Sequence, residues 1–81
     1  MYYHVIMYEY LKYNITKREY EVLSMVVCGY SNSRIARELF ISLSTVKAHL
    51  ENIYQKLDVH NKVQASVKVV IEGIVKKEDV V

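Results

Sequence analysis

Apolar residues recur every three or four positions in four successive stretches of this chain. That period predicts amphipathic helices, whereas apolar residues of a half-buried strand would alternate. The chain contains no proline and only two glycines, Gly29 and Gly73, so few positions interrupt a helix. We therefore predict an all-α fold with four helices. Their predicted ranges are 17–28, 33–40, 44–57 and 62–72, with the last one able to continue past Gly73.

Capping residues indicate where these helices begin and end. Thr16 and Glu19 have the spacing of a capping box, in which each side chain accepts a backbone N–H of the first turn. Asn61 and Gln64 have the same spacing before the fourth helix. Gly29 suits the left-handed conformation that ends many helices.

The second and third predicted helices are joined by the short connector Ile41-Ser42, and Ser42 is the expected N-cap of the third helix. Two helices joined by such a turn form a helix-turn-helix unit. One side of the third helix is small, polar or charged, and we expect it to be exposed. The apolar stripe of the second helix is Ile35, Ala36, Leu39 and Phe40, and that of the third is Val46, Leu50, Ile53 and Leu57.

The fourth helix is apolar on two sides. A chain this small can bury only one of them, and an exposed apolar stripe on a helix marks an interface. If Ala65 and Val69 pack inward, the other seam is free to pair two subunits. The alternative is that residues 2–13 cover that seam within one chain. The seam consists of Val63, Val67, Val70 and Ile74.

Composition narrows the class of protein. The 81 residues suffice for one small domain, and the net charge of +2 permits a nucleic-acid partner without demanding one. The single cysteine, Cys28, excludes an internal disulfide and a cysteine zinc cluster, and we interpret it as packing. No paired carboxylates, nucleophile–base pair or glycine-rich phosphate loop indicates an enzyme. We predict no metal, no cofactor and no small-molecule ligand.

The chain divides into three segments. Residues 1–13 hold five of the eight tyrosines and predict an N-terminal arm or helix, either as extra core or as a dimer or ligand element. Residues 14–75 are the predicted helix-turn-helix domain, and residues 76–81 a frayed tail. Neither a signal peptide nor an apolar run long enough to span a membrane is evident, so we expect a cytoplasmic protein.

From Thr16 to Ala65 the chain resembles the LuxR/FixJ-type (GerE-like) helix-turn-helix domain of bacterial transcription regulators. Because only about fifteen residues precede it, the chain looks like a stand-alone regulator, similar in build to the small sporulation regulators of that family. The resemblance is carried by Thr16-Lys17-Arg18-Glu19, Glu21-Val22-Leu23, Gly29, Ser31-Asn32, Ile35-Ala36, Leu39, Ile41-Ser42, Thr45-Val46-Lys47, His49-Leu50, Asn52-Ile53-Tyr54, Lys56-Leu57, Val59 and Ala65.

The resemblance implies that the third helix lies in the major groove of DNA and that helix 62–74 pairs two subunits on a roughly two-fold symmetric operator. RNA polymerase is a further partner to consider. Each polar residue also has a structural alternative, as a helix cap or a solvated side chain. The base-reading candidates are Lys47, Ala48, Glu51 and Ser44. The DNA-backbone candidates are Asn32, Ser33, Thr45, His49, Asn52 and Tyr54.

Three departures from the family pattern bear on function. The basic residue usual at Ser33 is found instead at Arg34, where an acidic one is usual, and Lys62 replaces an arginine. Glu51 lies on the side that would face phosphates, which repel it unless it accepts from a cytosine amino group. Glu51, the modest net charge of +2 and the tyrosine-rich residues 1–13 motivate a second hypothesis, in which the chain is a protein-interaction module that keeps the fold but acts on another regulator.

Overall fold

The computed structural model describes residues 12–75, which form four α-helices and no strand, as the sequence predicts. Residues 1–11 and 76–81 lie outside the described residues, and with them most of the predicted arm and all of the predicted tail. The helices are α2 (Lys17–Val27), α3 (Asn32–Leu39), α4 (Leu43–Leu57) and α5 (Lys62–Ile71).

The predicted caps are present at the first and last of these helices. Thr16 Oγ1 accepts the Glu19 N–H at 3.1 Å, and Glu19 Oε1 accepts the Thr16 N–H at 2.9 Å, which completes the capping box. Asn61 Oδ1 accepts the Gln64 N–H at 2.9 Å. Gln64 Oε1 does not return to Asn61 but accepts the N–H of His60 at 2.8 Å. In a standard capping box the Gln64 side chain would accept the N–H of the N-cap, Asn61. Here it accepts the N–H of the preceding residue, His60.

The two helices of the helix-turn-helix unit begin at serine caps. Ser31 Oγ accepts the Arg34 N–H, and Ser42 Oγ accepts the Thr45 N–H, each at 3.1 Å. Satisfying a first-turn N–H in this way stabilises a helix by about 1 kcal/mol. Ser31 is thus the N-cap of α3, and Asn32 is its first helical residue.

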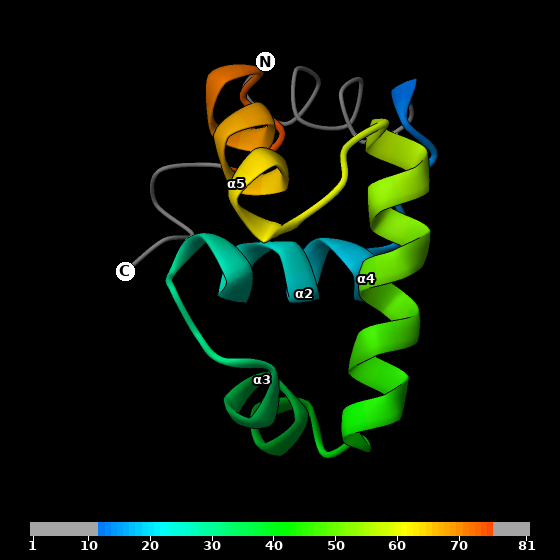
Figure 1. Ribbon diagram of the computed structural model, residues 1–81, viewed down its shortest axis with the longest axis vertical. Helices are drawn as coiled ribbons and strands as arrows, with labels where there is room; N and C mark the ends of the chain where they lie inside the picture. Colours follow the sequence, from blue (N-terminus) through cyan, green and yellow to red (C-terminus); the bar gives the residue numbers. More distant parts are fainter. Residues whose placement is uncertain (1–11, 76–81) are drawn as a thin grey trace.

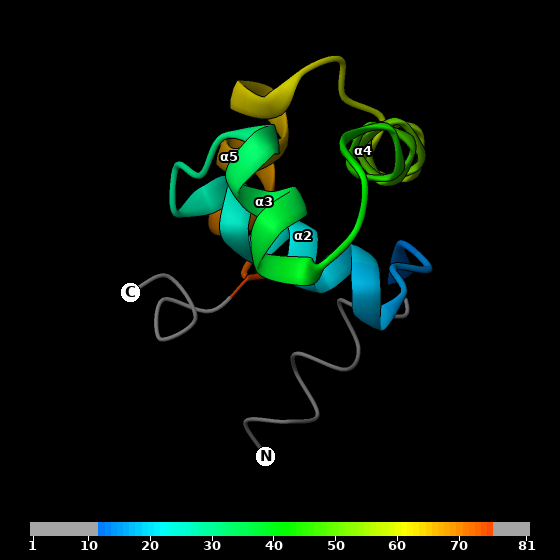
Figure 2. The ribbon, with the colours of Figure 1, turned by 90° about the horizontal axis from the view of Figure 1, so that it is seen from below.

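The longest helix, α4, runs along one side of the molecule, and the other three pack beside it (Figure 1). α2 crosses the middle and contacts both α4 and α5, while α3 contacts α4 near its N-terminal end. Viewed from below, α4 is seen end-on, and the other three helices lie on one side of it (Figure 2). This arrangement leaves the outer side of α4 uncovered by the other described helices.

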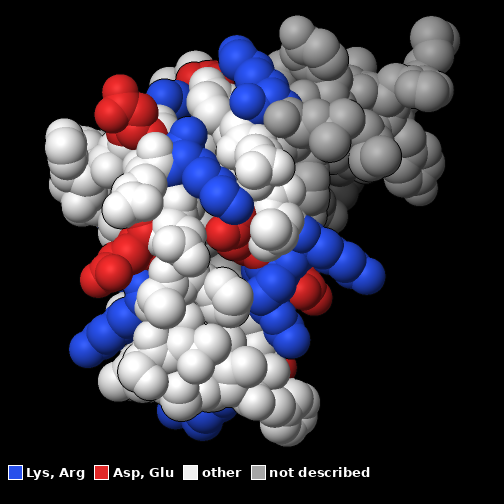
Figure 3. All heavy atoms as spheres, turned by 90° about the vertical axis from the view of Figure 1, so that its right-hand side faces the viewer, with Lys and Arg blue, Asp and Glu red and all other residues white. Residues whose placement is uncertain are grey.

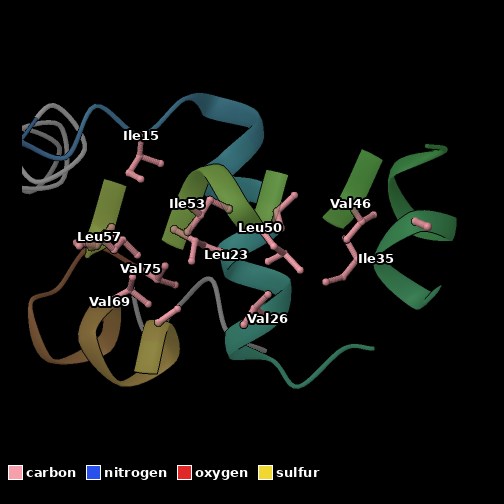
Figure 4. Packing of buried hydrophobic residues seen from close by; sticks show 14 residues of the cluster. Ile15, Leu23, Val26, Ile35, Val46, Leu50, Ile53, Leu57, Val69 and Val75 are labelled. Carbon is pink, nitrogen blue, oxygen red and sulfur yellow. The ribbon is translucent and has the colours of Figure 1, made fainter. Parts of the chain in front are cut away.

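The hydrophobic core is a single cluster shared by all four helices. Leu23 of α2 lies beside Ile53 of α4, and Leu57 lies close to Val69 of α5 (Figure 4). All four of these side chains are completely buried. The remaining buried apolar members are Ile15, Val22, Val26, Ile35, Ala36, Val46, Leu50, Ala65, Ile74 and Val75.

Phe40 is not part of the apolar stripe of α3, contrary to the prediction from its spacing. The helix ends at Leu39, and Phe40 adopts a left-handed backbone conformation with φ of 57°. Ile41 then donates its N–H to the Ala36 carbonyl at 3.0 Å, so the chain turns sharply toward α4. The turn directs the Phe40 side chain outward, where it is 94% exposed. Ile41 packs against the core in its place.

Ile74 does not continue the exposed seam of α5, so its assignment to the seam is wrong. α5 ends at Ile71, and Gly73 has a φ of 72°, which reverses the chain rather than extending the helix. The Ile74 N–H then bonds to the Val69 carbonyl at 2.8 Å. This reversal brings the Ile74 side chain into the core, where it is completely buried.

Gly29 ends α2 with a φ of 86°, as its position in the sequence predicts. A Cβ at this residue would meet no atom within 4 Å, so substitution is strained only through the backbone. We expect Gly29→Ala to lower the free energy of unfolding by about 1–2 kcal/mol, the cost of a left-handed conformation for a residue with a Cβ. Urea denaturation measures the change. Gly29→Asn is the control, because asparagine tolerates this conformation and should lose less.

Candidate nucleic-acid interface

The side of α4 opposite the core carries the predicted base-reading residues. Their places on one helix side follow from the helical repeat, since the buried residues of α4 recur at spacings of four, three and four. Figure 3 views this side and shows a broad uncharged area in its lower half, bordered by Lys or Arg and by Asp or Glu side chains. The exposed residues here include Ser44, Lys47, Ala48 and Glu51.

The start of α4 is held by a hydroxyl network. Ser42 Oγ lies 3.0 Å from Ser44 Oγ and 2.8 Å from Thr45 Oγ1, in addition to capping the helix. Ser44 and Thr45 are both exposed, and each hydroxyl has one donor and two acceptor sites. Binding Ser42 therefore still leaves them capacity for a phosphate or base. Both the capping alternative and the DNA contact remain compatible with this geometry.

The remaining predicted backbone contacts differ in exposure. On α4, Asn52 is exposed, while His49 and Tyr54 are half-buried. Tyr54 packs against the core, and burial raises the pKa of its hydroxyl, which stays a neutral donor. On α3, Ser33 is exposed, but the Asn32 Oδ1 atom is buried and has no hydrogen-bond partner among residues 12–75. Asn32 is thus less accessible than its position at the helix start suggests.

An ion pair not foreseen from the sequence joins the C-terminal half of α4 to the start of α2. Lys56 Nζ lies 2.7 Å from Glu19 Oε1 and donates to the Asn14 carbonyl at 2.9 Å. Burial raises the pKa of Glu19, but hydrogen bonds from Lys56 and Thr16 lower it by more, so it lies below its ordinary value. Because Lys56 is engaged in this way, it holds α4 in place rather than facing a ligand.

The exposed apolar side of α5 is formed by four aliphatic residues, which we call the α5 seam: Val63, Val67, Val70 and Ile71. Their side chains are between 52% and 77% exposed. Ala65 and Val69, on the opposite side, are completely buried in the cluster that includes α2. The side of α5 that contains Ala65 therefore packs into the core. The fourth residue of the exposed seam is Ile71, whereas the sequence predicted Ile74.

The alternative that residues 2–13 cover this seam falls almost wholly outside the described residues. Of that segment, Tyr13 donates its hydroxyl to Glu72 Oε1 at 2.5 Å. Lys68 Nζ lies 5.3 Å from the centre of the Tyr13 ring and donates to the Leu57 carbonyl at 2.6 Å. These contacts join residue 13 to the C-terminal end of α5.

Other kinds of site are not evident in residues 12–75. No group of three or more His, Cys, Asp or Glu side chains there could hold a metal ion. None of the helices in this part of the chain is both long and apolar enough to cross a bilayer. Cys28 caps the end of α2 and is half-buried, so it is more accessible than a core cysteine.

A short turn between α3 and α4, with the outer side of α4 left exposed, defines a helix-turn-helix domain. The family described as bacterial regulatory proteins, luxR family (GerE), matches residues 13–69. The chain belongs to this family, whose helix-turn-helix is a DNA-binding domain of transcription regulators.

Curated relatives agree with this assignment. The chain is 48% identical over 54 residues to the transcriptional regulatory protein LiaR of Bacillus subtilis, covering 67% of this chain and 26% of LiaR. It is 47% identical over 62 residues to the transcriptional regulatory protein DegU of Brevibacillus brevis, covering 76% of this chain and 26% of DegU. With the HTH-type transcriptional regulator MalT of Vibrio campbellii it shares 43% identity over 53 residues, which are 65% of this chain and 6% of MalT. The match thus spans about a quarter or less of each relative.

Proposed function

We propose that this protein is a sequence-specific transcription regulator that binds a roughly two-fold symmetric operator as a homodimer, with α4 in the major groove. The observation that carries the proposal is the outer side of α4, which is exposed and polar although the helix is firmly fixed by its buried face. A major groove admits one α-helix, and its base edges offer donors, acceptors and thymine methyl groups.

The proposed base-reading residues match these groups by chemistry. Lys47 can donate to guanine O6 and N7, and Ala48 is small enough to touch a thymine methyl. Glu51, one turn after Lys47, can accept from a cytosine amino group, which would turn an otherwise repulsive charge into a source of specificity. Ser44 can serve as donor or acceptor. Together they favour an operator half-site with G·C pairs opposite Lys47 and Glu51 and a thymine opposite Ala48.

Contacts to the DNA backbone would fix the position of α4 in the groove. Thr45, Asn52 and Tyr54 on α4 can each donate to a phosphate oxygen. His49, at the border of the buried face, can donate through a ring N–H. Ser33 and Asn32 occupy the first turn of α3, where the unpaired N–H groups favour an anion.

The α5 seam supports the homodimer. Two copies paired through it would remove eight aliphatic side chains from water, four from each chain, and each is at least half exposed alone. Burying the exposed part of each of these side chains contributes about 1 kcal/mol, so dimer formation gains about 8 kcal/mol from apolar burial. Association costs roughly 4–15 kcal/mol in lost freedom of motion. We therefore expect a weak dimer that DNA strengthens by binding both copies, with recognition helices about 34 Å apart.

Selection of binding sites from a pool of random duplexes tests the proposal. We expect enrichment of a motif made of two inverted half-sites, bound by two chains as judged by molar mass. The competing function is a protein-interaction module. Enrichment of no motif, together with recovery of a stable complex with another regulator, would establish that function instead.

Lys47→Ala tests the role of α4 directly. We expect it to weaken binding to the selected duplex by about 1–3 kcal/mol per half-site, and to relax the base preference at one position if Lys47 reads a base. Titration of the labelled duplex measures the loss of affinity, and titration of duplexes altered at single base pairs measures the base preference. Lys17→Ala is the matched control, because Lys17 is an exposed lysine on α2 outside the proposed interface. If Lys47→Ala binds as tightly as the wild type, the proposal that α4 contacts the DNA is wrong.

A further inference from the structure

Arg34 on α3 is held in place by an aromatic ring. Its guanidinium carbon lies 3.7 Å from the centre of the Tyr30 ring. At this distance the guanidinium is stacked on the ring face, an arrangement stabilised by attraction between the cation and the ring electrons. Arg34 itself is an exposed residue, so the contact fixes a side chain that would otherwise sample many conformations.

Tyr30 is well suited to fix another side chain because it is fixed itself. It is half-buried and packs against the hydrophobic core. Its N–H donates to the Met25 carbonyl at 3.0 Å, which ties it to the end of α2. The ring therefore has the rigidity of the core behind it. Ordering a long side chain on binding costs about 0.5–1.5 kcal/mol, and part of this cost is already met for Arg34 in the free protein.

Within residues 12–75, no carboxylate forms an ion pair with the guanidinium of Arg34. The ion pairs there join Lys56 to Glu19 and Arg18 to Glu21, and neither includes Arg34. The hydrogen bond from Arg34 to Ser31 Oγ uses the backbone N–H and does not engage the guanidinium. Stacking occupies the face of the guanidinium and leaves the N–H donors on its edge free. A planar set of free donors with a full positive charge matches a phosphate group.

We propose that Arg34, positioned by Tyr30, binds a phosphate of the DNA backbone beside the groove that α4 occupies. In a docked helix-turn-helix unit the first helix crosses the DNA backbone while the second lies in the groove, and α3 is that first helix. The inference rests on the proposed function and extends it. Arg34 contacts the DNA, whereas Tyr30 is a positioning residue that acts through Arg34.

The charge test is Arg34→Gln, measured on two duplexes, the selected motif and a scrambled version of it. Because phosphate contacts carry no sequence information, affinity for both duplexes should fall by the same factor, about tenfold at low salt. The slope of log K against log salt concentration should decrease by about 1 for each phosphate that the variant no longer neutralises. An unchanged slope on duplexes that the wild type binds overturns the inference and leaves the proposed function standing. If the wild type binds neither duplex, both the inference on Arg34 and the proposed function are overturned.

The positioning role is tested with two substitutions of Tyr30. Tyr30→Phe keeps the ring and should bind as the wild type does. Tyr30→Leu removes the ring and should weaken binding several-fold, but should have no further effect when combined with Arg34→Gln, since interacting residues are not additive. Circular dichroism on heating checks that each variant is folded. If Tyr30→Leu weakens binding equally with and without Arg34, its effect is on the fold, and the positioning role is overturned.

Discussion

Val67→Asp is expected to separate the proposed dimer and reduce affinity for the two-fold operator at least about a hundredfold, or about 2.7 kcal/mol. Val67 belongs to the α5 seam and is 52% exposed in the single chain, so a carboxylate there remains in water and should leave the fold intact. In a dimer the same carboxylate would be buried without a partner, at a cost of several kcal/mol. Sedimentation equilibrium over a range of concentrations, with and without duplex, measures the change.

The control for this substitution is Val67→Thr, which has nearly the same shape and no charge. It should weaken the dimer much less than the aspartate does. Binding to a duplex with one half-site should be little affected by either variant, because it needs no second chain. If Val67→Asp still assembles two 9.5 kDa chains on the operator, the dimer does not form through α5.

Lys56→Met is expected to lower the free energy of unfolding by about 2–3 kcal/mol. Removing one partner of a fully buried ion pair costs roughly 3–5 kcal/mol. The loss is smaller here because the Lys56 side chain retains 27% exposure, although that of Glu19 is only 5% exposed. Urea denaturation at neutral pH measures the loss. Arg18→Met is the matched control, since the Arg18–Glu21 pair is 43% exposed on both sides at 3.7 Å and should contribute about 0.5 kcal/mol or less.

The effect of Lys56→Met should depend on pH through Glu19. The pKa of Glu19 is below its ordinary value of 4.5 in the folded protein, so the unfolded chain binds this proton more readily. The stabilising effect of the ionised carboxylate is therefore fully present above pH 4.5 and is lost as the pH falls through the lower folded-state value. The stability difference between the wild type and Lys56→Met should shrink below pH 4.5. A difference that stays constant down to acid unfolding would assign the loss to packing of the lysine stem.

Local signals predicted the helices and their starts well. The caps at Thr16, Ser42 and Asn61 act within three residues of the helices they begin, so their spacing is visible in the sequence. The buried face of α4 follows from the helical repeat alone. The exposed polar face follows as its complement, so the repeat predicts that Lys47 and Ala48 are exposed, while the family resemblance implies that they read bases.

Periodicity failed where the backbone changes direction. Phe40 and Ile74 each continue an apolar stripe in the sequence, but each lies beyond the last residue of its helix. One left-handed residue, Phe40 itself or Gly73, redirects the next side chains. The result is that Phe40 turns out to solvent and Ile74 into the core. A helical pattern cannot show such a turn, because it assumes that the helix continues.

The outer side of α4, the recognition face of the proposed regulator, was determined by the sequence itself, through caps and periodicity that act over a single helix. Only the tertiary structure decided how that face is held and what surrounds it. The Lys56–Glu19 pair joins residues 37 positions apart, and the core packing of Tyr30 sets the position of Arg34. Packing against α2 likewise chose which side of α5 is buried. These features depend on contacts between helices, which no local pattern of residues encodes.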